Sequence, residues 1–182
     1  MIHHRPFELA VPVSAADHML GSEHAAVTVV EYGDFECPNC KQAAPVVKML
    51  LERFVGRVRI AFRHFPLEEI HPHALAAALA AEAAAGQGKF WPMHDLLFDN
   101  QHHLKPSQIH GYAERLELDM TRYDADMRDA LYLQHVREDI EGGNLSGVRA
   151  TPTFFVNGKL QDISYGLQAL AEDIDAALRP NK

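Results

Sequence analysis

The pattern of apolar residues over the stretch 27–63 is the feature that most restricts the fold of this chain. Residues 27–32 are rich in β-branched side chains and almost continuously apolar, which is typical of a strand covered on both faces. From Pro38 to Gly56 apolar residues recur at helical spacing, and residues 57–63 then alternate apolar side chains with arginine, as in a half-exposed strand. Strand, helix and strand in so short a stretch predict a right-handed βαβ unit.

The remaining sequence predicts a helical block and then a return to strands. Residues 74–85 are strong helix formers, and three or four amphipathic helices follow before a stop at Gly142 and Gly143. A hairpin is predicted next, with strands over 153–156 and 160–163 joined by an Asn-Gly turn, and a last helix over 167–178. This order predicts an α/β core interrupted by an all-helical insertion.

The charge and hydropathy of the chain limit its partners. Seventeen Lys and Arg residues against 25 Asp and Glu residues give a net charge of -8, so the surface should repel nucleic acid and anionic lipid. The most apolar stretch, 74–81, is far shorter than the roughly 18 residues of a membrane span. Residues 1–8 lack the apolar core of a secretory signal, so we expect a cytoplasmic protein; a chain trimmed of its signal would instead be exported.

The two cysteines of the chain form a C-x-x-C motif at the predicted junction of strand and helix. Cys37 and Cys40 are too few and too close together to hold distant segments, and the motif next to a βαβ unit predicts redox chemistry. A thiol at a helix N-terminus meets backbone N–H groups and the positive end of the helix dipole, which lower its pKa. We expect Cys37 to be the exposed nucleophile and Cys40, one turn inside the helix, the resolving thiol.

Two other interpretations of the C-x-x-C motif stay open. A structural disulfide closing so small a loop would contribute only about 2 kcal/mol. Half of a zinc site, completed by His71 or His73, is the stronger alternative, although no second C-x-x-C follows. We expect neither a metal nor a cofactor.

Glu31 precedes Cys37 by six residues in the first predicted strand. Its carboxylate could reach solvent at the end of the strand. It could also be a buried acid with a raised pKa that exchanges protons with Cys40 through water. Its shared strand face with Val27 and Val29 favours the buried acid.

Several stretches together resemble the DsbA-like branch of the thioredoxin superfamily, and the resemblance covers about residues 17–178. The stretches are Glu31–Cys40, Phe62–Leu67, His71–His73, Phe90–Trp91 and Ala150–Gly158. The C-x-x-C motif, Pro45 in the following helix and a Thr-Pro pair before a hairpin are specific in combination. The resemblance implies a thioredoxin fold in a single unit of residues 1–182, with a core of residues 17–66 and 146–182 and a helical insertion of residues 67–145.

The same resemblance implies a function and a set of site residues. It implies a thiol-disulfide oxidoreductase that acts on protein or peptide thiols and disulfides through Cys37 and Cys40, with glutathione or a thioredoxin-type protein as recycling partner. It also implies a cis peptide bond between Thr151 and Pro152, and substrate contacts from these two residues and from Pro38 and Asn39.

Two points limit what the resemblance carries over. Asn39 stands where periplasmic oxidases of this branch have a histidine, so strong oxidising power does not carry over. For His64, His71 and His73 a structural or surface role is favoured. The alternative function is a non-catalytic thioredoxin-like module that binds proteins through the same groove.

Overall fold

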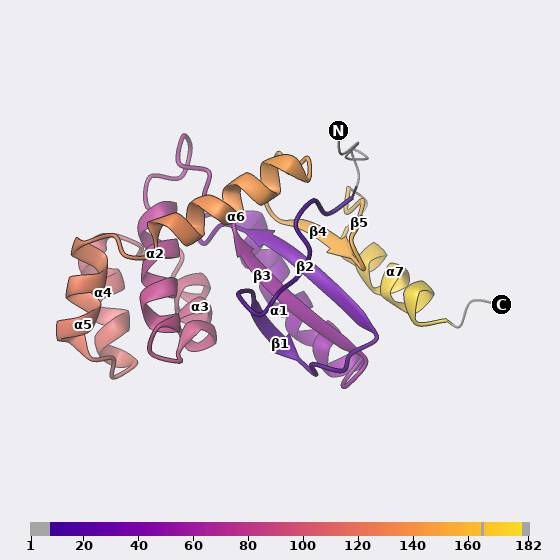
Figure 1. Ribbon diagram of the computed structural model, residues 1–182, viewed down its shortest axis with the longest axis horizontal. Helices are drawn as coiled ribbons and strands as arrows, with labels where there is room; N and C mark the ends of the chain where they lie inside the picture. Colours follow the sequence, from indigo (N-terminus) through magenta and orange to yellow (C-terminus); the bar gives the residue numbers. More distant parts are fainter. Residues whose placement is uncertain (1–7, 165, 180–182) are drawn as a thin grey trace. The chain divides into compact units, whose positions relative to one another are not determined.

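The computed structural model describes residues 8–164 and 166–179, so most of the segment on which the expectation about an export signal rests lies outside the described residues. The strands are β1 (His18–Gly21), β2 (Val27–Gly33), β3 (Val58–His64), β4 (Thr153–Val156) and β5 (Lys159–Leu160). The helices are α1 (Pro38–Arg53), α2 (Ala74–Ala85), α3 (Phe90–Asp99), α4 (Pro106–Arg115), α5 (Met120–Arg128), α6 (Leu133–Leu145) and α7 (Gln168–Leu178) (Figure 1).

The chain divides into two compact units. The first unit comprises Met1–Gly33, Gln42–Arg63 and Glu141–Lys182, and the second comprises Asp34–Lys41 and His64–Ile140. The expected division into a core of residues 17–66 and 146–182 and an insertion of residues 67–145 stays a prediction.

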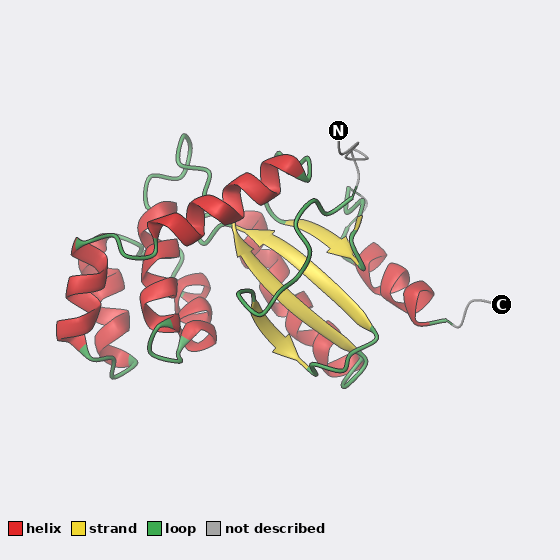
Figure 2. Cartoon of the chain, in the orientation of Figure 1, coloured by secondary structure: helices red, strands yellow, loops and turns green. Residues whose placement is uncertain are grey.

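A five-stranded sheet forms the centre of the first unit, with the strand order β1-β3-β2-β4-β5 (Figure 2). β1 runs antiparallel to β3, β4 runs antiparallel to β2, and β5 runs antiparallel to β4. β2 and β3 are neighbours in the sheet and are joined through α1, as the predicted βαβ unit requires. The α/β prediction is therefore confirmed.

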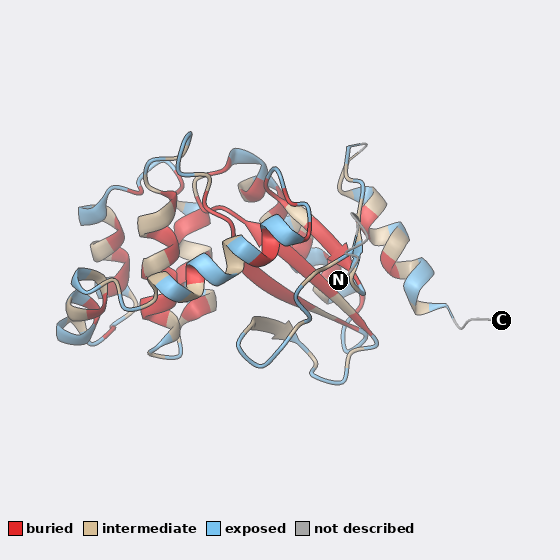
Figure 3. Ribbon diagram, turned by 45° about the horizontal axis from the view of Figure 1, so that its top comes forward, coloured by how far each residue is buried: buried red, intermediate tan, exposed pale blue. Residues whose placement is uncertain are grey.

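The core of the first unit packs one face of the sheet against α1 and α7. The apolar positions that recur at helical spacing in α1 are all buried, and β2 and β3 are buried over most of their length (Figure 3). Each large side chain removed from water in this way contributes about 1.5–3 kcal/mol. The central members of this core are Val27, Val29, Ala43, Val47, Leu50, Phe54, Val58, Ile60, Phe154, Val156, Leu170 and Ile174.

Helices α2 to α5 and most of α6 belong to the second unit, and this confirms the predicted all-helical block. Seven alanines of α2 are buried, and their small side chains let neighbouring helices approach closely. Among the described residues, none of the helices has both the length and the apolar character needed to cross a membrane.

Three features of the first unit differ from the sequence-based expectations, and the first is the second strand of the hairpin, which covers Lys159–Leu160 and not residues 160–163. The strand β1 was not expected, because its four residues contain no β-branched side chain. The pair Gly142 and Gly143 does not end α6, which continues to Leu145. A Cβ atom on Gly142 would lie only 3.2 Å from the Val11 side chain and 3.3 Å from the Tyr32 hydroxyl, so this glycine permits a close approach within the helix.

The expectation of a half-exposed β3 is also wrong at Arg63, which is only 4% exposed. Its guanidinium donates to the Asp17 carboxylate at 2.6 and 3.1 Å and to the Tyr32 hydroxyl at 3.1 Å. It also donates to the backbone carbonyls of Val11 and Pro12. A buried charge is tolerated where it is paired in this way, and an alternating pattern cannot reveal such a partner.

Candidate active site

Four residues, Asp34–Cys37, connect β2 to α1, and Asp34 shapes this connection, which we call the active-site turn. The Asp34 carbonyl accepts the Cys37 N–H at 3.1 Å, and the Asp34 Oδ1 atom accepts the Glu36 N–H at 2.7 Å. Aspartate favours turns because its side chain can bond to the backbone two residues later in this way. The turn therefore places Cys37 immediately before the first helical residue, Pro38.

Cys37 occupies the position at which the hydrogen bonds of α1 begin. Its carbonyl accepts the Lys41 N–H at 3.2 Å, which is the first bond of the helix. Pro38 suits the first helical position because it has no N–H to satisfy, and the backbone N–H groups of the first turn point towards this end of the helix. These groups and the helix dipole favour a negative charge on the Cys37 sulfur.

The expectation of an exposed Cys37 is wrong, because the residue is only 6% exposed. Pro38 and Asn39 are the exposed residues at this end of α1. The motif thus shows its two central residues to solvent, while both sulfur-bearing residues are buried.

Cys40 is completely buried in the first turn of α1. The Asp34 N–H donates to its sulfur at 3.5 Å, so Asp34 contacts both ends of the C-x-x-C motif through its own backbone. A donated hydrogen bond stabilises a thiolate more than a thiol. This arrangement suits a resolving cysteine that must become an anion in order to attack.

The two acidic side chains of the active-site turn each contact a histidine. The Asp34 Oδ2 atom accepts the Leu67 N–H at 2.9 Å and lies 2.8 Å from His71 Nδ1. Glu36 accepts the His73 N–H at 2.7 Å and lies 2.9 Å from His73 Nδ1. The negative charge that these acids bring towards Cys37 is therefore balanced in part by hydrogen-bond donors.

Gln101, which follows α3, also contacts the active-site turn. Its side-chain amide donates to the Phe35 carbonyl at 2.9 Å and to the Cys37 carbonyl at 2.8 Å, and the residue is 6% exposed. Sequence reasoning missed this residue, because an isolated glutamine 61 positions after Cys40 belongs to no motif.

Glu31 lies in β2, opposite Phe154 of β4, and is 3% exposed. Burial raises the pKa of its carboxyl from 4.5 to about 8, because the apolar surroundings disfavour the charged form. The prediction of a buried acid with a raised pKa is therefore confirmed, and the solvent-exposed alternative is wrong.

Thr151 and Pro152 are buried, and the peptide bond between them is cis. They directly precede β4, in which Thr153 is paired with Tyr32 of β2. Of the site residues expected from the sequence, Glu31, Thr151 and Pro152 thus belong to the first unit, whereas Cys37, Pro38, Asn39 and Cys40 belong to the second.

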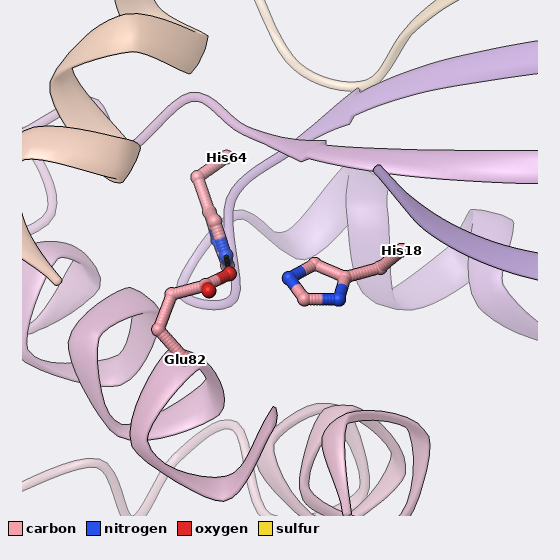
Figure 4. A group of neighbouring side chains, drawn as sticks. All are labelled: His18, His64 and Glu82. Atoms are coloured by element: carbon pink, nitrogen blue, oxygen red, sulfur yellow. Dashed lines mark hydrogen bonds and ion pairs between the residues drawn. The ribbon is translucent and has the colours of Figure 1, made fainter. Parts of the chain in front are cut away.

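The half-zinc-site alternative receives no support from the described residues. The group of potential metal ligands found there contains His64 and Glu82 but neither cysteine. His64 Nε2 and Glu82 Oε1 are 2.7 Å apart and both side chains are buried (Figure 4). The Nδ1 atoms of His71 and His73, the ligands considered for zinc, face carboxylates instead.

A mixed α/β sheet with a C-x-x-C motif at a helix start is typical of thioredoxin-like proteins. The sequence profile of the thioredoxin family matches residues 14–176. The chain therefore belongs to the thioredoxin family.

Solved structures support the DsbA-like fold of the chain. BdbD from Bacillus subtilis superposes with a TM-score of 0.85 at 24% identity, covering 96% of this chain and 99% of BdbD. A thioredoxin-like oxidoreductase from Silicibacter pomeroyi DSS-3 gives 0.82 at 26% identity, over 92% and 95% of the two chains. α-DsbA2 from Wolbachia pipientis gives 0.78 at 20% identity, over 89% and 87%. The predicted thioredoxin fold with a helical insertion is confirmed.

The curated relatives are longer proteins that are named Na⁺/H⁺ antiporters. The chain is 49% identical over 171 residues to the Na⁺/H⁺ antiporter NhaA 1 of Salinispora arenicola, covering 93% of this chain and 26% of the antiporter. It is 46% identical to the Na⁺/H⁺ antiporter NhaA 3 of Salinispora tropica, with 95% and 27% covered. The chain spans about a quarter of the length of the curated relatives it matches.

The raised pKa of Glu31 predicts how stability depends on pH. The folded state holds the Glu31 proton up to about pH 8, whereas the unfolded state holds it only up to about pH 4.5. The free energy of unfolding is therefore highest below pH 4.5 and falls as the pH rises from 4.5 through 8. The loss should approach about 1.4 kcal/mol per pH unit within this window. Urea unfolding of the wild type and Glu31→Gln at pH 5, 7 and 9 measures it, and the variant should lack this slope. Parallel pH profiles for the two proteins would contradict the buried, titrating carboxyl.

Proposed function

We propose that this protein is a thiol-disulfide oxidoreductase that exchanges disulfides with protein or peptide thiols through Cys37 and Cys40. The position of Cys37 at the start of α1, with Cys40 one turn further on and hydrogen-bonded to the Asp34 N–H, carries this proposal. Family membership supports it, as does the 26% identity with a protein described as a thioredoxin-like oxidoreductase. The non-catalytic binding module remains the alternative, and it does not require two cysteines at a helix start.

The reaction consists of two thiol-disulfide exchanges. The Cys37 thiolate attacks one sulfur of a substrate disulfide, the substrate S–S bond breaks, and the other substrate sulfur leaves as a thiolate. Cys40 then loses its proton and attacks the Cys37 sulfur, which releases the second substrate sulfur and forms a Cys37–Cys40 disulfide. Two electrons pass to the substrate, and glutathione or a thioredoxin-type protein restores the dithiol. Run in reverse, the same steps oxidise a substrate dithiol.

Glu31 is the proposed acceptor of the Cys40 proton. Its pKa of about 8 is close to that of an ordinary thiol, near 8.5, so a proton can pass in either direction at little free-energy difference. An ordinary exposed glutamate, with a pKa near 4.3, would be a much weaker base.

Substrate binding is proposed for the exposed Pro38 and Asn39 and for the segment Thr151–Pro152. The exposed pair lies between the two cysteines in sequence and gives the motif its solvent-accessible surface. The backbone of Thr151 is proposed to hold an extended substrate segment by strand addition. The cytoplasmic location stays a prediction.

Cysteine variants test the proposed reaction. Cys37→Ser should abolish the reduction of insulin, because no nucleophile remains at the helix start. Cys40→Ser should accumulate a mixed disulfide between Cys37 and the substrate, because the second exchange cannot occur; mass spectrometry after acid quenching identifies it. Unchanged insulin reduction by Cys37→Ser, or a failure of Cys40→Ser to trap substrate, would favour the binding module.

The proton transfer to Glu31 has a kinetic signature of its own. In single-turnover experiments Glu31→Gln should slow the release of substrate from the mixed disulfide by roughly 10²-fold or more and leave the first attack by Cys37 nearly unchanged. Thr28→Val, in the same strand, is a control that removes a hydrogen bond to Arg59 but no carboxyl group. Equal effects of Glu31→Gln on both steps would show that the carboxylate is not the proton acceptor.

We further propose a Na⁺/H⁺ antiporter as the partner of this module. The favouring observation is that 93% of the chain is matched, at 49% identity, by only 26% of a protein named as such an antiporter. A segment that occurs within the same polypeptide as an antiporter is expected to act on it, because the linkage raises the effective concentration of each for the other.

The antiporter partnership can be tested with purified components. The Salinispora arenicola antiporter is prepared without the segment that matches this chain and is placed in vesicles. The vesicles are mixed with the Cys40→Ser variant, whose Cys37 is held in a mixed disulfide with a small thiol that leaves readily when another thiol attacks. We expect a mixed disulfide with an antiporter cysteine, and none with the double variant Cys37→Ser/Cys40→Ser. Labelling of bovine serum albumin at the same rate as the antiporter would refute the partnership and leave the oxidoreductase proposal intact.

A further inference from the structure

Side chains outside the active-site turn hold each of its four residues. The Asp34 side chain contacts the Leu67 N–H and His71, and the Glu36 side chain contacts His73. Phe35 and Cys37 are held through their backbone carbonyls, because both accept a hydrogen bond from the Gln101 side chain. All of these contacts lie within the second unit.

The contact from Gln101 differs from the others because it reaches the backbone of the nucleophilic residue, Cys37. One of its two amide hydrogens is given to the Cys37 carbonyl, which also accepts the first helical hydrogen bond from Lys41. The other hydrogen is given to the Phe35 carbonyl, two residues earlier. One planar amide group thus fixes the backbone on both sides of Glu36 and sets the direction in which Cys37 enters α1.

From these contacts we infer that Gln101 is a positioning residue for the Cys37 thiolate, an inference that rests on the proposed function. The stabilisation of a thiolate by first-turn N–H groups depends on the sulfur being held in line with them. The amide hydrogens also offset the negative end of the Cys37 carbonyl dipole, which lies within the same residue as the sulfur. Gln101 therefore lowers the pKa of the Cys37 thiol without touching the substrate.

The charged and titratable groups around Cys37 act on the same thiolate and must be separated from Gln101. On the active-site turn these are Asp34 and Glu36, and on the segment packed against it they are His71 and His73. Within α1, Cys40 and Lys41 are the nearest titratable residues to Cys37 in sequence. None of them is altered by a substitution at Gln101, so a change in the titration of Cys37 reports on the amide.

The test compares Gln101→Met with Gln87→Met. Methionine keeps the length and apolar volume of glutamine but donates no hydrogen bond. Gln87 is a matched control in the second unit, because its amide also donates to a backbone carbonyl, that of Asp119. The rate of Cys37 alkylation is measured from pH 4 to 10 in a Cys40→Ser background, together with the thermal midpoint of unfolding for each protein.

The expected result is a higher Cys37 pKa in Gln101→Met, with alkylation below that pKa slower by roughly threefold to tenfold, as the loss of one or two hydrogen bonds implies. Gln87→Met should keep the wild-type titration. In Gln101→Glu a carboxylate replaces the donor near the thiolate, so the pKa should rise further. Gln101→Asn, with a shorter amide, should recover part of the shift if it reaches the Cys37 carbonyl.

The two proposals fail in distinguishable ways. If Gln101→Met unfolds at a lower temperature but its Cys37 thiol titrates as in the wild type, Gln101 has only a structural role and the inference is wrong. This holds even if the wild type is active in the insulin assay. A wild type without any exchange activity would refute the proposed function, while a raised Cys37 pKa in Gln101→Met would still support the positioning of the thiolate. A Gln101→Met variant that fails to fold is replaced by Gln101→Glu, whose unchanged titration would overturn the inference.

Discussion

The hydrogen bonds that Asp34 makes within the active-site turn are the constraint on which the rest of the site depends. Its carbonyl and its Oδ1 atom close the turn onto Cys37 and Glu36, and its N–H reaches the Cys40 sulfur. The remaining carboxylate oxygen accepts the Leu67 N–H and contacts His71. One buried residue, 2% exposed, thus defines the end of β2, the start of α1 and the surroundings of the second thiol.

Patterns of short range revealed most of the fold and the chemically reactive residues. The helix around Cys40, the buried strand around Glu31 and the turn at Asn157 and Gly158 each follow from residues that are neighbours in sequence, so periodicity and turn propensity suffice to predict them. The C-x-x-C motif gains its meaning from its place at the strand–helix junction, which the same periodicity locates. The raised pKa of Glu31 could be anticipated because its strand face is shared with Val27 and Val29.

Features that depend on distant partners could not be predicted in the same way. The alternating pattern predicts an exposed Arg63, whereas the structure buries it against Asp17, which lies 46 positions earlier. Gly142 is predicted to end a helix, but it lies inside α6, where the side chain of Val11 occupies the space that a Cβ atom would need. Gln101 has no sequence signal, because its role consists of two hydrogen bonds to backbone carbonyls, and any residue type presents those. Long-range polar contacts of this kind are decided by the tertiary fold.

The burial of Glu31 lowers the stability of the folded chain. Holding a carboxyl neutral at pH 7, when its pKa is about 8 rather than 4.5, costs about 3 kcal/mol, a large share of the 5–15 kcal/mol by which a domain is usually stable. A leucine opposite Phe154 would suit the same apolar surroundings without that cost. An acid placed so unfavourably in the strand that precedes the C-x-x-C motif fits the role proposed for Glu31, because a pKa near 8 lets a carboxyl take up and release a proton near neutral pH.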